Sequence, residues 1–197
     1  MAIARYVEPQ ITYTVASAAQ IAIGDAVRGV GIDLDAIGSP ARAEHKLARM
    51  WRRDEFTIST DRAHLDLDVI WRYLHDESYW AAGIPRDLVE RSVERSLNFG
   101  LFAGEAGHGG TQIGFSRVVT DHATFAWLCD VFVLPAYRGR GLATWLIETV
   151  TRHPDLQPQR TVLLATRDAH ALYERFGWRP VESGRLMRIF RPYRTDA

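Results

Sequence analysis

A strand, a glycine-rich turn and a helix follow one another in the second half of the chain, and this succession constrains the fold most. Thr124–Leu134 is almost entirely apolar or β-branched, which predicts a buried strand, and Pro135 ends it because proline cannot donate to a ladder. After the turn Arg138–Gly141, apolar residues recur at helical spacing through Leu142–Thr151. The next apolar run, Thr161–Ala165, is expected to return as a strand, and such a crossover implies parallel pairing.

The turn between this strand and helix has the features of an anion site. The first amides of a helix have no partner within the helix and point outward at the positive end of its dipole. Gly139 and Gly141 carry no side chain that would hold a phosphate away, while Arg138 and Arg140 add complementary charge. We therefore expect a phosphorylated cofactor here. The predicted contacts are Arg138, Gly139, Arg140, Gly141, Leu142 and Ala143.

Two common phosphate motifs do not fit this turn. A P-loop needs a lysine and then a serine or threonine after its last glycine, whereas Gly141 is followed by Leu142 and Ala143. A dinucleotide fingerprint has a glycine at the position of Thr144. It also requires an acidic residue about 20 residues later on a second strand, and this chain has none there. The remaining pattern, Arg138-x-x-Gly141-x-Ala143, resembles the diphosphate turn of the GCN5-related N-acetyltransferases (the GNAT family), which bind acetyl-coenzyme A.

A second segment, Ala165–Val181, resembles the coenzyme-side helix of the same family. That helix usually reads Asn-x-x-Ala-x-x-Leu-Tyr-x-x-x-Gly-Phe. The positions that match it are Ala169, Leu172, Tyr173 and Gly177, whereas Thr166 replaces the asparagine and Trp178 replaces the phenylalanine. The resemblance implies that Thr166 and Ala169 contact the cofactor, and a threonine hydroxyl could either cap the helix or bond the pantetheine arm.

The resemblance covers the chain from about Phe56 to Phe190 and implies an α/β (α+β) fold. In this family a central mixed sheet of six to seven strands is flanked by about four helices. The residue patterns predict strands at 56–58, 97–103, 112–119, 124–134, 161–165, 178–181 and 186–190, and helices at 67–74, 85–96, 141–151 and 168–176.

The first part of the chain carries no motif. We interpret residues 1–53 as an N-terminal extension of open structure, and residues 54–197 as the acetyltransferase domain. Within the extension, alternation over Ile11–Val15 is compatible with a short strand, and Pro40–Arg53 is compatible with a helix.

The resemblance also assigns chemistry to the central strand. Direct transfer of an acetyl group from a thioester to an amine develops an oxyanion, and in this family a main-chain amide of that strand is thought to stabilise it. The implied residues here are Val131, Phe132 and Val133, whose strand edge would also pair with the pantetheine chain. Tyr173 is the expected acid, because a phenol with a pKa of about 10 can protonate the thiolate as the C–S bond breaks.

The general base and the acceptor site are more open. Asp130 lies one residue before the oxyanion strand and is a candidate for a catalytic base or an amine-binding group. Other candidates are Asp121, His122, Glu77 and His170, or a chain of water molecules. Between the first two predicted helices, Tyr79 and Trp80 either wall the pocket of a primary amine or pack the helix pair.

Composition excludes several other classes. The 24 basic and 24 acidic side chains balance, which argues against nonspecific binding to nucleic acid or to a membrane surface. Cys129 is the single cysteine and there is no HExxH motif, so neither an internal disulfide nor a metal is expected. No run approaches the roughly 18 apolar residues of a membrane span, and no signal-peptide core is present, which favours a cytoplasmic protein.

The leading hypothesis is therefore an acetyl-coenzyme A-dependent N-acetyltransferase that acts on a primary amine of a small molecule or a protein. The alternative is a noncatalytic coenzyme A-binding domain of the same fold. A third reading, an antibiotic-modifying enzyme, predicts an acidic acceptor cleft, for which residues 61–80 contain enough Asp and Glu. A homodimer is a further possibility, because the sequence does not determine the oligomeric state.

Overall fold

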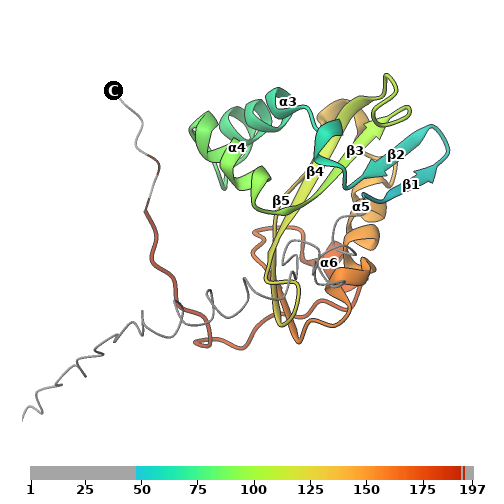
Figure 1. The fold of residues 1–197 in the computed structure, drawn as a ribbon. Coiled ribbons are helices and arrows are strands. Elements are labelled where there is room, and N and C mark those ends of the chain that lie inside the picture. The colour runs from blue at the N-terminus through green and yellow to red at the C-terminus, as the bar shows by residue number, and fades with distance from the viewer. Residues whose placement is uncertain (1–47, 192, 194–197) are drawn as a thin grey trace, which may run out of the picture. The chain divides into compact units, whose positions relative to one another are not determined.

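The structure is a computed structural model that describes residues 48–191 and residue 193. The described part contains a mixed sheet whose strands lie side by side in chain order (Figure 1). The strands are β1 (Met50–Arg53), β2 (Phe56–Ser59), β3 (Leu97–Ala103), β4 (Thr111–Thr120), β5 (Phe125–Val133) and β6 (Thr161–Leu164). Neighbours are antiparallel up to β5, and β6 is parallel to β5. The predicted mixed sheet and its parallel last pair are therefore confirmed.

The helices begin where the sequence provides caps. The α-helices are α3 (Leu67–Arg72), α4 (Arg86–Glu94), α5 (Leu142–Thr151) and α6 (His170–Glu174), and a π-helical turn, η2 (Tyr73–Glu77), extends α3. Asp66 caps α3 by accepting the amides of Asp68 at 3.0 Å and Val69 at 3.1 Å, and Pro85 precedes α4. Gly177 follows α6 with φ of +88°, a conformation that favours glycine at a helix end.

Each face of the sheet is covered by its own apolar core. On one face, α5 packs Leu142, Leu146 and Ile147 against the strands. On the other face, α3 and α4 pack around Ile70 and Val89 (Figure 1). Burial of each such side chain contributes roughly 1.5–3 kcal/mol, so both layers are firmly held to the sheet.

A β-bulge in β5 changes which residues face each core. Phe132 pairs with Phe115, whereas Cys129 pairs with Arg117, so two residues of β5 oppose one residue of β4. Asp130 lies in the bulge with φ of +55°, a left-handed conformation that is uncommon for residues other than glycine. Because the extra residue shifts the alternation by one, Val131 and Val133 face the α5 core, and Phe132 between them faces the α3–α4 core.

The parallel pairing of β5 with β6 ends soon after the strands meet. The ladder runs from Phe125 and Thr161 to Leu128 and Leu164, and it does not extend to the bulge. Beyond Leu128 the edge of β5 that faces β6 has no strand partner in the described part of the chain. The two strands therefore open a gap at their carboxyl ends.

Two sequence-based predictions are wrong. Residues 178–181 and 186–190 form no strands; they have no regular secondary structure, and Met187 is 98% exposed. Pro180 cannot donate to a ladder and Gly184 adopts φ of +82°, so a regular hairpin is interrupted twice. Within the predicted helix over Pro40–Arg53, residues 50–53 instead pair with β2 as strand β1; residues up to 47, including Ile11–Val15, lie outside the described part.

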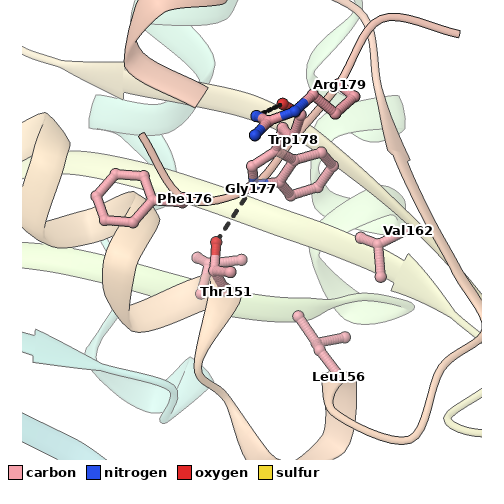
Figure 2. Close-up of a pocket in the computed structure, with 8 residues that line it drawn as sticks. Thr151, Leu156, Val162, Phe176, Gly177, Trp178 and Arg179 are labelled. Carbon is pink, nitrogen blue, oxygen red and sulfur yellow. Dashed lines mark hydrogen bonds between the residues drawn. The ribbon is translucent and has the colours of Figure 1, made fainter. Parts of the chain in front are cut away.

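Trp178 shows what replaces the missing strand pairing. Its indole Nε1 donates to Thr151 Oγ1 at 3.4 Å, at the end of α5 (Figure 2). Thr151, Phe176 and Trp178 line a cavity of about 260 Å³ together with Leu156 and Val162. The chain after α6 is thus anchored to α5. None of the residues predicted for catalysis or cofactor binding lines this cavity.

Candidate active site

The glycine-rich turn presents unpaired amides, as predicted. Gly139 and Gly141 adopt φ of +78° and +72°, and Gly141 is the N-cap residue of α5 without a capping side chain. The first amide of this region with a backbone acceptor is Trp145, which donates to Gly141 O at 3.1 Å. Within the described residues, the amides from 139 to 144 have no acceptor, and a Cβ at Gly139 would meet no atom within 4 Å. The turn is therefore open to an anion.

Arg138 ties this turn to the rest of the site. Its Nε donates to Val133 O at 3.0 Å, and its Nη2 donates to the hydroxyl of Tyr73 at 3.0 Å. Arg140 lies with its guanidinium 5.5 Å from the ring centre of Tyr137. The guanidinium of Arg138 thus already bonds two protein oxygens, whereas Arg140 is the more available cation of the pair.

The edge of β5 beside the gap carries main-chain donors. Leu134 donates its amide to Ile113 O on β4 at 2.8 Å. Because successive amides of a strand point to opposite edges, the amide of Val133 points away from β4. Phe132 is held by its ring, which stacks on Tyr73 with centres 3.9 Å apart. The strand is therefore clamped by its side chains while part of its backbone faces the gap.

A cleft of about 620 Å³ lies where β5 and β6 separate. It is lined from β5 by residues 127 to 131, from the segment after β6 by residues 165 to 169, and from the η2–α4 loop by Tyr79 and Trp80. Tyr173 of α6 and two residues of the C-terminal segment, Arg188 and Phe190, complete the lining. The cleft thus brings together Tyr173, Asp130, Val131, Thr166, Ala169, Tyr79 and Trp80 from the predicted site.

Tyr173 has the environment of a protonated phenol. Its side chain is buried, and burial followed by the nearby Tyr79 raises the pKa of Tyr173 to about 12. Its hydroxyl makes no hydrogen bond with the described residues, although its ring packs against Trp178 with centres 6.0 Å apart. The phenol can therefore donate a proton to a group in the cleft at neutral pH.

Asp130 is held by two partners. Arg117 Nε donates to Oδ2 at 2.5 Å, and the indole of Trp80 donates to Oδ1 at 3.2 Å. Arg117 also donates from Nη1 to Ser96 Oγ at 3.3 Å, at the end of α4. Because both carboxylate oxygens are engaged and Asp130 is buried, this ion pair fixes the bulge between the sheet and the helices.

Cys129 also borders the cleft, but its thiol is not activated. Burial raises the pKa of Cys129 to about 12, with Arg117 opposing the rise. Nucleophilic cysteines need a thiolate, which is scarce at neutral pH when the pKa is this high. The site therefore lacks the features of an acyl-cysteine enzyme.

The other predicted contacts and base candidates have definite positions. Thr166 Oγ1 accepts the amide of Ala169 at 3.1 Å, so it caps the turn before α6. Asp121 lies in the β4–β5 turn, where the Thr124 hydroxyl and three amides hold the pKa of Asp121 far below its usual value. Asp121, His122, Glu77 and His170 are absent from the lining of the cleft.

Comparison with known proteins identifies the family. The family model described as an acetyltransferase (GNAT) domain matches residues 98–180. A protein of Gibberella zeae named "Putative acetyltransferase" is 32% identical over 138 residues, which cover 62% of this chain and 78% of that protein. The chain belongs to the GNAT family of acetyltransferases.

Solved structures agree with this GNAT assignment. A GNAT-family crystal structure from Xanthomonas campestris is 44% identical, with a TM-score of 0.65, and the match covers 72% of this chain and 96% of that one. A Staphylococcus aureus structure is 20% identical with a TM-score of 0.54 over 70% of this chain and 99% of that one, and it shows a likeness of fold alone. Among the described residues, no helix has the length and apolar character that a bilayer span requires.

The sequence analysis missed three residues of this GNAT site. Arg117 is the one charged residue in the strand Thr111–Thr120, whose other residues are apolar or uncharged. A single charge in such a strand indicates that it pairs with an opposite charge inside the fold. Arg188 and Phe190 were assigned to a terminal strand, although both line the cleft. No local pattern in their segment points to that position.

Proposed function

We propose that the protein transfers an acetyl group from acetyl-coenzyme A directly to a primary amine of a small molecule. The observation that carries this proposal is that the glycine turn and the cleft with Tyr173 are connected by the open edge of β5. The unpaired amides at residues 139–144 fit a pyrophosphate, and the open edge of β5 leads from there to the cleft that contains Tyr173. The glycine turn leaves space for phosphate oxygens, so the residues present fit the cosubstrate.

The arrangement supports a single-step transfer. Arg140 and the turn amides would hold the phosphates, and the β5 edge would bond the pantetheine arm as an added strand does. The neutral amine attacks the acetyl carbonyl carbon, and the amide of Val133 or Val131 stabilises the oxyanion, which is worth roughly 3–4 kcal/mol for one donor. As the C–S bond breaks, Tyr173 gives its proton to the thiolate and is reprotonated by the proton that the amine releases to solvent.

Asp130 fits a positioning role better than that of a general base. Both of its carboxylate oxygens already accept hydrogen bonds from protein donors, one from Arg117 and one from Trp80, so neither is free to accept a proton from an amine in the cleft. We assign Asp130 to holding the bulge that turns the β5 amides toward the gap. Deprotonation of the amine is then left to water in the cleft.

Tyr173→Phe tests the proposed acid. Loss of a general acid typically costs about 100-fold or more in turnover, so kcat in a thiol-release assay should fall by roughly that factor, with near-unchanged affinity for coenzyme A. Tyr137→Phe is the matched control, because Tyr137 does not line the cleft. Full turnover of the Tyr173 variant would remove this residue from the mechanism.

The noncatalytic alternative uses the same turn without the chemistry. It predicts tight binding of coenzyme A in calorimetry together with no rise in thiol release for any amine in a broad panel. That pair of results would replace the enzyme proposal. The cytoplasmic location and the homodimer stay predictions.

A further inference from the structure

The C-terminal segment supplies one wall of the cleft and, among the described residues that line it, the one charged side chain without an oppositely charged partner. Arg188 and Phe190 both line the cleft, and the guanidinium of Arg188 lies 5.3 Å from the ring centre of Phe190. No carboxylate among the residues that the structure describes forms an ion pair with Arg188. The arginine therefore presents its donors to whatever enters from this side.

The carboxylates of the cleft are already neutralised. Asp130 is bound by Arg117, and Asp168 is bound by Arg167, whose Nη2 lies 3.2 Å from Oδ2. The Asp168 pair is exposed and weak, but it still leaves no excess negative charge. The three arginines, Arg117, Arg167 and Arg188, thus face two carboxylates, those of Asp130 and Asp168. The net charge of the groups that line the cleft or pair with its lining is +1.

Three of the five acidic residues between 61 and 80 are engaged with other groups. Asp66 caps α3, Asp68 binds Arg86, and Asp76 binds the ring of His75 at 2.6 Å. None of these three lines the cleft. An acceptor with several ammonium groups, as the antibiotic-modifying hypothesis requires, would thus meet a cleft in which both carboxylates of the described lining are already paired with arginines.

The remaining walls are aromatic. Tyr79, Trp80 and Phe190 are 49%, 40% and 70% exposed, and Trp127 joins them from β5. Partly exposed rings around a cleft favour an apolar or aromatic group of a ligand. The rings of Tyr79 and Trp80 lie edge to face with centres 5.0 Å apart, so this wall is preformed.

We propose that the acceptor is an amine that also carries a carboxylate beside an apolar side chain, as an aromatic amino acid does, and that Arg188 binds this carboxylate. This inference rests on the proposed acetyl transfer for the identity of the site as an acceptor site. Arginine binds carboxylates through paired, charge-assisted hydrogen bonds, which gives it both affinity and orientation. The tail would close over the acceptor with Arg188 at the carboxylate and Phe190 at the side chain.

The test measures binding of the acetylated product, so that the pKa of an amine does not enter. N-acetylphenylalanine and N-acetylphenylalaninamide are titrated into the full chain with coenzyme A present, and calorimetry gives the ratio of their dissociation constants. A bidentate charged pair predicts that the acid binds roughly 10- to 100-fold more tightly than the amide. Arg188→Gln should bring this ratio near one, and Arg188→Lys should restore part of it.

Arg185→Gln is the matched control on the same segment. Arg185 pairs with Glu182 at 3.1 Å and does not line the cleft, so its variant should keep the wild-type ratio. Three results would each overturn the proposal. The wild type could bind the acid and the amide equally, it could bind neither compound, or the Arg188→Gln variant could keep the full ratio.

Thiol release separates this inference from the proposed function. If neutral amines or polyamines are acetylated while the acid shows no advantage, the acetyl transfer stands and the carboxylate inference is overturned. If the acid is preferred through Arg188 but no amine raises thiol release, the carboxylate recognition is supported while the proposed activity fails.

Discussion

Placing a negative charge in the glycine turn is the sharpest test of the cofactor site. Gly139→Asp introduces a carboxylate beside the amides that are proposed to hold the pyrophosphate, and Gly139→Asn introduces the same shape without charge. Both residues tolerate positive φ better than other side chains, so the strain at φ of +78° is nearly matched. Gly139 is preferable to Gly141, because a Cβ at Gly141 lies 3.9 Å from Arg53 Nη2, which could neutralise an added carboxylate.

The magnitude follows from Coulomb's law at contact distance. Two unit charges about 4 Å apart repel by about 1 kcal/mol in bulk water and about 4 kcal/mol at the effective dielectric of a protein surface. The turn is exposed, so its value lies between these limits. The Asp variant should therefore bind coenzyme A roughly 5-fold to several hundred-fold more weakly than the Asn variant.

Calorimetric titration of both variants at two salt concentrations measures this difference. Because salt screens exposed charges, the gap between Asp and Asn should narrow as the salt concentration rises. Equal affinities of the two variants at low salt would refute the placement of the pyrophosphate at this turn. If both variants bind more weakly than the wild type and a gap between Asp and Asn remains, the shared part of the loss measures backbone strain and the gap measures the charge effect.

Two further changes test the surroundings of the site. Cys129→Ser should keep acetyl transfer, because a thiol whose pKa is raised to about 12 is not a nucleophile; loss of turnover in a folded variant, measured by thiol release, would contradict this. His153 packs edge-on against Phe99, and burial lowers its pKa below the unfolded value of about 6.5. Since the unfolded chain then binds the extra proton, stability should be fully present above about pH 6.5 and fall as the pH drops toward the folded pKa. His153→Asn keeps an acceptor for the amide of Asp155 and should remove this dependence in denaturant titrations at several pH values; an unchanged pH profile would exclude His153 as its source.

The parts of the fold that could be predicted are those coded by local residue patterns. The strand Leu97–Ala103 agrees residue for residue with the predicted boundaries, and α5 begins immediately after Gly141, within one residue of the prediction. Glycine conformation and amide exposure at the turn also follow locally, since a helix start needs no distant partner to leave its amides unpaired. The unpaired amides at the turn were predictable for that reason.

The parts that failed depend on distant contacts. The partners of Asp130 are 13 and 50 residues away along the chain, so no sequence window contains the ion pair with Arg117 or the bond from Trp80. The mostly apolar residues 186–190 were expected to pair as a strand with residues 178–181, but strand formation also requires an available neighbour. Here that segment contributes Arg188 and Phe190 to the cleft instead.

The extra residue at Asp130 has a consequence for how related chains can vary in length. Side chains alternate between the two faces along β5, so the direction of each residue after Asp130 depends on how many residues separate it from Leu128. Deleting one residue there would turn the side chains of Val131 and Val133 to the opposite face and their amides toward β4. The loop at residues 104–110 has no such alternation to keep, and it is held instead by the buried Ala106, whose amide donates to Thr57 Oγ1 at 3.1 Å. We therefore expect an insertion or a deletion between Cys129 and Val133 to turn the amide of Val133 away from the gap, and with it the donor that is proposed to stabilise the oxyanion.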